Sequence, residues 1–257
     1  FDFGFQPLAD DLQLISSRDR KYVSYPLIIN LCKDCMILQN KYIVGDKILY
    51  PNNYHYLPGI SKDIVNNFKN LARFIIKKYK IKKTDLIVDV GCNDGSLLNE
   101  FQKLDFKNVV GVEPTDAINI AKKRGIRTYK SFFNKKVAKK IQKRGLAKII
   151  ITTNVFAHTA KLGDFITATR ALLDKDGFFI VENHYLKKVI EKNQFDSFYH
   201  EHLRTYSLHS LKKLLNYYRF NLVFAKTSER YGGNIQAHFS KKKMKMENNC
   251  KKILTSE

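Results

Sequence analysis

The chain has 257 residues, of which 44% are hydrophobic and 27% are charged, and its formal net charge is +22. This length is sufficient for one α/β domain with a small additional module. No apolar run approaches the roughly 18 residues that a membrane span requires, and the polar, acidic start is unlike a signal peptide, so we expect a cytoplasmic protein without membrane contact.

The high positive charge is compatible with nucleic-acid binding, because basic surfaces attract phosphates. Most of the basic residues, however, are lysines that are spread along the whole chain among many Asn and Ile residues, a composition typical of AT-rich coding sequences. Basic residues form runs at residues 135–144 and 241–243. We therefore keep nucleic-acid binding only as an alternative.

Residues 1–60 carry most of the prolines and show no helical periodicity, which predicts a small irregular N-terminal module. Cys32 and Cys35 lie within it at the spacing of half a tetrahedral zinc site. No second pair follows, because Cys92 and Cys250 stand alone. From the residues alone, two isolated thiols are as well supported as a zinc site, and the few cysteines fit a reducing compartment.

Strand and helix patterns alternate over residues 61–240, which predicts an α/β domain with a mostly parallel sheet and helices on both faces. Apolar residues at helical spacing indicate a first helix over residues 61–79. The expected strands are 86–90, 108–113, 148–153, 177–182, 221–226 and 234–239, and the further helices begin near residues 96, 116, 137, 165 and 207. The last two strands should form an antiparallel hairpin, followed by a Lys-rich tail over residues 241–257.

The strand over residues 86–90 leads through a turn of small residues into a helix, an arrangement that exposes backbone N–H groups to a ligand. Gly91 and Gly95 permit close backbone approach, and Asn93 tolerates the left-handed conformation. The spacing differs from the G-x-G-x-x-G dinucleotide motif. Asp89, at the strand end, indicates a cationic ligand instead.

The next strand ends in Glu113 and Pro114, and Glu113 lies 24 residues after Asp89 (113 − 89). An acid at about this offset is placed to bind both hydroxyls of a ribose. Together the two strand ends resemble motifs I and II of the class I S-adenosylmethionine (SAM)-dependent methyltransferases. The alternative is an ordinary α/β turn with a capping aspartate.

Ionisable residues gather after the later strands, at the sheet edge where ligands of open α/β folds bind. Asn154 and His158 follow one strand, and the segment Tyr199-His200-Glu201-His202 lies in a loop after the next. We expect function at this segment and at His158, whereas His184 and His209 are interpreted as structural or exposed. The Asn/Asp-Pro-Pro-aromatic motif common in enzymes that methylate base amines is absent after residue 153.

A more specific resemblance covers nearly the whole chain. The chain resembles the sugar C-methyltransferases that act on nucleotide-linked 3-keto-deoxysugars, through Gly4-Phe5-Gln6-Pro7-Leu8-Ala9, Tyr25-Pro26-Leu27, Cys32 with Cys35, Asp89-Val90-Gly91-Cys92-Asn93-Asp94-Gly95, Gly111-Val112-Glu113-Pro114, Asn154-Val155-Phe156-Ala157-His158, Phe198-Tyr199-His200-Glu201-His202-Leu203 and Tyr231-Gly232-Gly233-Asn234-Ile235. That family has an N-terminal module binding zinc through four cysteines, a central class I methyltransferase domain and a C-terminal domain. We therefore expect this chain to be part of a longer, monomeric protein, with Cys32 and Cys35 as half of the zinc site.

The resemblance also implies the roles of site residues. His202 would be the general base, while Tyr199, Glu201 and His158 would position the keto sugar, and Glu201 and Tyr199 would also orient His202. Tyr54, Tyr56 and Asn234 are the further candidates for substrate binding, and Asn154 joins Asp89, Gly91, Asn93, Gly95, Glu113 and Pro114 as a candidate for SAM binding.

The chemistry agrees with these roles, because carbon becomes a nucleophile only after a C–H beside a carbonyl loses its proton, which needs a base and donors for the enolate oxygen. His158 or His200 as the base, an O- or N-methyltransferase of another small metabolite, and a non-catalytic SAM-binding module are the alternatives.

Overall fold

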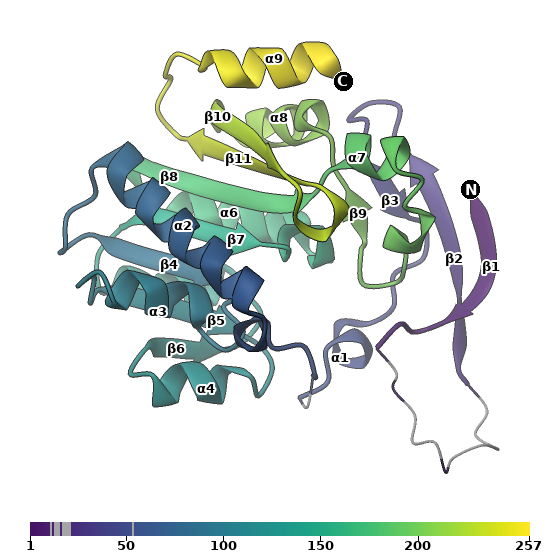
Figure 1. The fold of residues 1–257 in the computed structure, drawn as a ribbon, viewed down its shortest axis with the longest axis horizontal. Coiled ribbons are helices and arrows are strands. Elements are labelled where there is room, and N and C mark those ends of the chain that lie inside the picture. The colour runs from purple at the N-terminus through teal and green to yellow at the C-terminus, as the bar shows by residue number, and fades with distance from the viewer. Residues whose placement is uncertain (11, 13–15, 17–21, 53) are drawn as a thin grey trace.

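The computed structural model describes residues 1–10, 12, 16, 22–52 and 54–257. These residues form a large α/β domain and a smaller sheet beside it (Figure 1). Within the described ranges, no helix is both long and apolar enough to cross a lipid bilayer.

The large domain is built on a seven-stranded sheet with the order β10-β11-β8-β7-β4-β5-β6. The strands are β4 (Leu86–Val90), β5 (Val109–Glu113), β6 (Arg127–Lys130), β7 (Ala147–Thr153), β8 (Leu173–His184), β10 (Asn221–Ser228) and β11 (Asn234–Ser240). Strands β4 to β8 are parallel, whereas β11 is antiparallel to both β8 and β10. The predicted mostly parallel sheet with a C-terminal antiparallel hairpin is confirmed.

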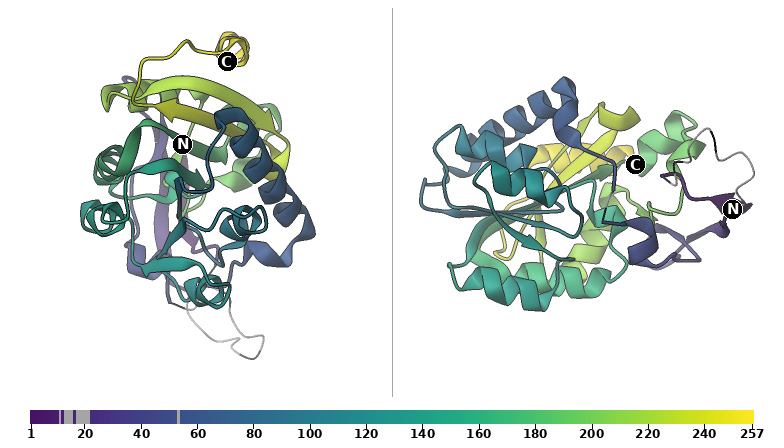
Figure 2. Two further views of the ribbon diagram at one scale, coloured as in Figure 1. Left: turned by 90° about the vertical axis from the view of Figure 1, so that its left-hand side faces the viewer. Right: turned by 90° about the horizontal axis from the view of Figure 1, so that it is seen from below.

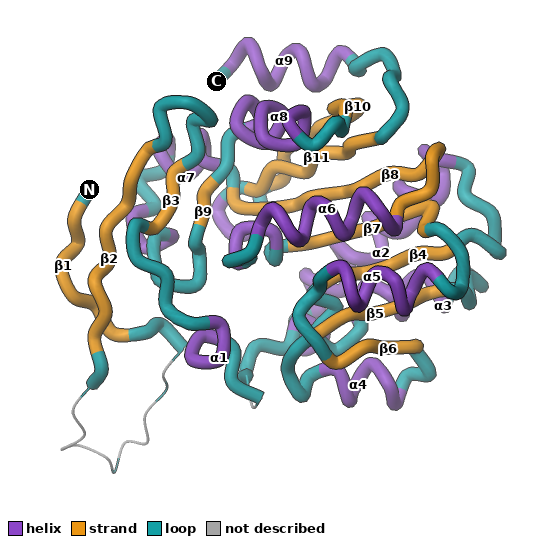
Figure 3. Tube along the Cα trace, turned by 180° about the vertical axis from the view of Figure 1, so that it is seen from behind, coloured by secondary structure: helices purple, strands orange, loops and turns teal. Residues whose placement is uncertain are grey.

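Helices cover both faces of this sheet. Figure 1 shows α2 (Lys62–Tyr79) and α3 (Ser96–Gln102) on one face, and Figure 3 shows α5 (Lys135–Gln142) and α6 (Leu162–Leu172) on the other. Side chains of β4 alternate between two apolar cores, because Leu86, Val88 and Val90 join the cluster under α5 and α6 while Ile87 joins the cluster under α2 and α3. The remaining helices of this domain are α4 (Ile118–Lys123), α7 (Leu186–Glu191) and α8 (Leu208–Tyr217).

Helix α2 forms where the sequence predicts the first helix, over residues 61–79. The Ser61 hydroxyl accepts a hydrogen bond from the Ile64 N–H at 3.4 Å and thereby caps the helix. Phe68, Leu71 and Ile75 lie on one side of the helix and are buried. The helix therefore packs its apolar stripe on the sheet beside the strand that carries Asp89.

The N-terminal residues form a small antiparallel sheet that the sequence analysis did not predict. It has the order β1 (Asp2–Pro7), β2 (Ser24–Leu31), β3 (Leu38–Asn40) and β9 (Arg204–Thr205). Short α1 (Asp46–Leu49) follows. Because β3 pairs with β9, this sheet joins the N-terminal module to the chain just after His202. The right-hand view of Figure 2 shows the N-terminal strands beside the large domain.

Three more elements differ from the sequence prediction. The edge strand β6 was missed, since most of its side chains are partly or fully exposed. Strand β8 begins at Leu173, four residues before the predicted start at residue 177. The segment expected only as a Lys-rich tail contains α9 (Asn248–Ser256), whose Cys250 is fully buried.

Candidate active site

A cavity of about 680 Å³ lies at the carboxyl ends of β4, β5, β7 and β8. Most of the predicted site residues line it: Tyr54, Tyr56, Asp89, Gly91, Asn93, Glu113, Pro114, Asn154, His158, Tyr199 and His202. Residues from the turn after β4 and from the loop before β9 therefore share one space, as expected for the carboxyl edge of a parallel sheet.

The turn after β4 carries the conformations that its small residues allow. Gly91, Asn93 and Gly95 all have positive φ angles of 77°, 48° and 76°. Gly95 does not line the cavity: a Cβ there would lie 2.8 Å from the Ala121 Cβ, so this glycine permits α3 to pack on α4. Gly95 therefore has a packing role in this structure, while Gly91 and Asn93 face the cavity.

Asp89 is a deeply buried acid of the cavity, with 2% of its surface exposed. Its Oδ1 atom has no hydrogen-bond partner among the described residues. Burial, reinforced by the Glu113 and Asp94 carboxylates, raises the pKa of Asp89 to about 8. A buried carboxyl without a partner is suited to a cationic ligand, which would favour its ionised form.

Glu113 is held by backbone and side-chain donors from two loops. Its Oε1 accepts hydrogen bonds from the Thr115 N–H at 2.9 Å and the Thr115 hydroxyl at 2.8 Å, and its Oε2 accepts one from the Asn93 N–H at 3.2 Å. These contacts fix the carboxylate at the cavity wall, where its remaining lone pairs can accept two hydroxyl groups.

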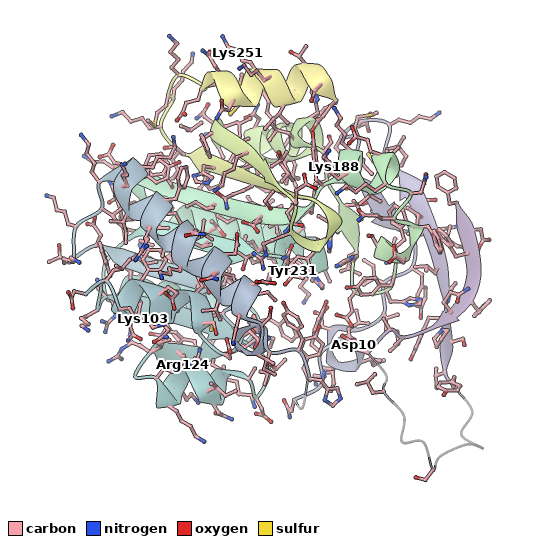
Figure 4. All side chains as sticks on the ribbon, viewed as in Figure 1. Asp10, Lys103, Arg124, Lys188, Tyr231 and Lys251 are labelled. Atoms are coloured by element: carbon pink, nitrogen blue, oxygen red, sulfur yellow. The ribbon has the colours of Figure 1, made fainter. Side chains whose placement is uncertain are left out.

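Residues 50–52 and 54–61, here called the strap, line the cavity beside the turn after β4 through Tyr50, Tyr54, Tyr56 and Pro58. The Asn93 side-chain amide donates to the Tyr56 carbonyl at 2.8 Å, and the Gly59 N–H donates to Asp94 Oδ2 at 3.1 Å. The Tyr56 and Tyr231 hydroxyls are 2.6 Å apart, which joins the strap to the β10–β11 loop. Figure 4 labels Tyr231 close to the beginning of α2, the helix that follows the strap.

His202 is held by hydrogen bonds at both ring nitrogens. Its Nδ1 lies 2.7 Å from the Ser197 carbonyl oxygen, and its Nε2 lies 3.0 Å from the Tyr199 hydroxyl. A carbonyl only accepts, so Nδ1 carries the hydrogen and Nε2 presents a lone pair to Tyr199. Burial and the neighbouring His158 and His184 lower the pKa of His202 well below its ordinary range, so the ring is neutral near pH 7.

Glu201 lies behind the cavity wall, and it does not orient His202. The Tyr54 hydroxyl donates to Glu201 Oε2 at 3.0 Å, while the Ser197 carbonyl holds the His202 ring. Burial and the nearby Asp10 raise the pKa of Glu201 to about 8. The expected pairing of Glu201 with His202 is not among the hydrogen bonds of the described residues: the Ser197 carbonyl is the acceptor at His202 Nδ1, and Glu201 accepts from Tyr54.

His158 and His184 complete a group of three rings. The His158 and His202 ring centres are 4.9 Å apart, and those of His184 and His202 are 4.6 Å apart. The Tyr50 hydroxyl lies 2.8 Å from His158 Nδ1, and burial lowers the pKa of His158 to about 3. The sequence analysis missed Tyr50 and His184 as cavity residues, although His184 follows a predicted strand end.

Two other predicted residues lie outside the cavity. His200 directs Nε2 toward the Tyr25 carbonyl at 3.2 Å, away from His202, which disfavours it as the base. Asn234 is fully buried in β11 and does not line the cavity; its amide donates to Asn154 Oδ1 at 3.2 Å. In this structure Asn234 therefore supports Asn154 from within the sheet.

Cys32 and Cys35 lie at a tight turn between β2 and β3. The Cys35 N–H donates to Cys32 Sγ at 3.5 Å, and the Met36 N–H donates to the Cys32 carbonyl at 2.9 Å. This places both thiols on one turn, as two ligands of a metal would require. The described part of the chain contains no group of three or more His, Cys, Asp or Glu that could hold a metal ion.

Comparisons with known proteins place this cavity in context. Residues 64–224 match a family described as a methyltransferase domain. The C-methyltransferase NovU of Streptomyces niveus is 29% identical over 235 residues, which cover 91% of this chain and 56% of NovU. The chain therefore spans little more than half the length of this curated relative.

Solved structures share the fold. Magnesium protoporphyrin IX methyltransferase from Synechocystis PCC 6803, with bound SAH, is 14% identical with a TM-score of 0.52, covering 69% of this chain and 83% of that one. A S-adenosylmethionine-dependent methyltransferase from Clostridium acetobutylicum ATCC 824 is 17% identical with a TM-score of 0.52, covering 67% and 91%. At these identities the likeness concerns the fold alone.

Proposed function

The chain belongs to the methyltransferase domain family and has the α/β fold of SAM-dependent methyltransferases, and from this premise we propose that it methylates a carbon of a nucleotide-linked keto sugar. The observation that carries the proposal is the Tyr199–His202–Ser197 array in the same cavity as Asp89 and Glu113. The likeness to a C-methyltransferase supports the same choice.

The cofactor site would use the residues around the turn after β4. Glu113 would accept the two ribose hydroxyls, and Asp89 would lie near the cationic portion of SAM. Gly91 and Asn93 would let the ligand approach the backbone. Bound SAM supplies an electrophilic methyl group, and the residues of this chain must supply the nucleophile.

His202 would generate that nucleophile. The lone pair on Nε2 would take a proton from the carbon beside the substrate carbonyl, and the electron pair of the C–H bond would move into an enolate. The Ser197 carbonyl would stabilise the resulting imidazolium through Nδ1–H. Because the ring is buried and neutral, it can accept a proton at pH 7.

The Tyr199 hydroxyl would donate a hydrogen bond to the carbonyl oxygen of the same substrate. This hydroxyl lies 3.0 Å from Nε2, a spacing that lets one group meet the carbonyl oxygen while the other meets the adjacent C–H. Tyr199 would turn its O–H from Nε2 to the substrate oxygen when substrate binds, which frees the base. His158, held by Tyr50, and Tyr54, held by Glu201, would line the sugar site.

Exchange of the substrate's α-hydrogen tests this assignment without methyl transfer. With a nucleotide-linked 3-keto-deoxysugar in D₂O and no SAM, the protein should catalyse deuterium incorporation beside the carbonyl, followed by NMR. His202→Asn should slow exchange and methylation by about 10²–10⁴-fold, while SAM binding is retained. His209→Asn, which alters an exposed histidine paired with Glu257, is the matched control. Wild-type rates in His202→Asn would place the base elsewhere.

We also propose that Cys32 and Cys35 contribute half of a structural zinc site. Zinc requires four ligands in such sites, and the two thiols share a turn that could present both to one ion. The remaining ligands would have to come from residues other than those described.

A further inference from the structure

The cavity is lined by more acids than bases. Its charged lining residues are Asp10, Asp46, Asp89, Glu113, Lys161, Asp164 and Arg230. Both proposed ligands carry anionic groups: SAM has a carboxylate and a nucleotide-linked sugar has phosphates. These groups need a cation or free N–H donors, and Lys161 lies at the exposed rim. Arg230 is the lining cation that is mostly buried, with 15% of its side chain exposed.

The Arg230 guanidinium is fixed in place by its surroundings. Its Nη1 donates to Glu182 Oε1 at 3.0 Å, and its Nη2 donates to the Tyr231 hydroxyl at 3.3 Å. The guanidinium also lies over the Phe68 and Tyr231 rings, 5.4 Å and 4.9 Å from their centres. Arginine has five N–H donors, and these two hydrogen bonds leave others for a ligand.

Glu182 accepts hydrogen bonds from other side chains besides Arg230. The buried carboxylate also accepts from the Gln236 amide at 2.6 Å and from the Asn234 amide at 3.4 Å. Glu182 thus orients Arg230 while two neutral donors share its negative charge. A cation held in this way, with most of its side chain buried, presents its remaining N–H donors in a fixed orientation to a further anionic partner.

We propose that Arg230 binds an anionic oxygen group of a cavity ligand, either the carboxylate of SAM or a phosphate of the nucleotide-linked sugar. The ligands are those of the proposed function, on which this inference rests. Arg230 stands in the β10–β11 loop, next to Tyr231, which is labelled in Figure 4. The Tyr231 hydroxyl lies 2.6 Å from the hydroxyl of Tyr56 in the strap. An anion at Arg230 would therefore lie beside the strap.

Binding measurements on Arg230→Gln test the proposal. Calorimetry would compare S-adenosylhomocysteine with 5′-methylthioadenosine, which lacks the amino-acid portion, and with thymidine and uridine diphosphates. If the anion is the carboxylate, S-adenosylhomocysteine should bind about tenfold to hundredfold more weakly while methylthioadenosine binds as before. If it is the phosphate, only the diphosphates should lose affinity to this extent.

Matched variants keep the test decisive. Arg127→Gln, an exposed change on β6, should leave all affinities unchanged. Glu182→Gln keeps an Oε1 acceptor that can orient Arg230 but removes the negative charge beside it, so this variant should strengthen binding of the same anionic probe. If Arg230→Gln fails to fold, the affinity of Glu182→Gln for the anionic probe tests whether Arg230 binds the anion. Unchanged affinity for every probe in Arg230→Gln, or weaker anion binding in Glu182→Gln, would overturn the proposal. Because these are binding assays, a chain that binds S-adenosylhomocysteine through Arg230 but methylates no sugar would refute only the proposed function.

Discussion

Replacing Asp89 by Asn should stabilise the ligand-free protein and weaken its hold on the cofactor. Asp89 is buried, its Oδ1 has no partner among the described residues, and burial raises its pKa from an ordinary 3.8 to about 8. Between these two values the unfolded chain is ionised at this position while the folded protein holds the proton. The folded state therefore loses stability as pH rises through this window, and the loss is complete above about pH 8.

The size of the effect follows from the shift. One pKa unit corresponds to about 1.4 kcal/mol, so a shift of about four units sets an upper limit of about 5–6 kcal/mol. Relaxation of the site and entry of water reduce this, and we expect Asp89→Asn to gain about 2–3 kcal/mol at pH 8.5 and less at pH 5.5. Urea unfolding of both proteins at several pH values measures the difference.

A surface variant and a binding experiment complete this test. Asp105→Asn changes an exposed aspartate, whose side chain is 81% exposed, and should alter stability little. At pH 7 a carboxyl with a pKa of about 8 is about nine-tenths protonated, so SAM binding should release close to one proton in the wild type and none from this site in Asp89→Asn. Two results together would refute this account of Asp89. The wild type and Asp89→Asn would lose stability with rising pH in parallel, and both would release the same number of protons when SAM binds.

Three further predictions address the remaining parts of the site. Glu113→Ala should weaken SAM binding by roughly 1.5–3 kcal/mol through loss of charge-assisted ribose contacts, and unchanged affinity by calorimetry would remove Glu113 from the cofactor site. Because burial lowers the pKa of His202, the acid limb of the kcat profile should lie below pH 6.5 at saturating substrates; a limb at or above 6.5 would contradict a buried neutral base. Metal analysis of residues 1–257 should find zinc below stoichiometry and easily removed by chelators, since Cys32 and Cys35 leave two ligand positions open; stoichiometric, chelator-resistant zinc would mean that the other ligands lie within these residues.

Local sequence pattern was enough to predict the elements that carry the proposed cofactor-binding residues. The run before Asp89 and the small residues after it define a strand, a turn and a helix within 17 residues (102 − 86 + 1). Helix α2 was equally predictable, because its cap and its apolar stripe lie within its own sequence. The missed edge strand β6 lacks such a pattern, since none of its four side chains is buried.

Contacts between distant parts of the chain could not be predicted in the same way. The pairing of β3 with β9 joins residues more than 160 positions apart, and Tyr50 meets His158 across 108 positions. The acceptor that orients His202 is the backbone carbonyl of Ser197, which carries no side-chain signature. The amide of Asn234 gave no sign in the sequence that it would support Asn154 from inside the sheet.

The most direct test of the central claim is the product of the reaction. The protein would be incubated with a nucleotide-linked 3-keto-deoxysugar and SAM carrying a ¹³C-methyl group, and the product analysed by mass spectrometry and NMR. Our account predicts one labelled methyl group bonded to the carbon beside the carbonyl, and loss of this product in His202→Asn. A label on oxygen or nitrogen, or no transfer by a protein that binds SAM, would contradict it.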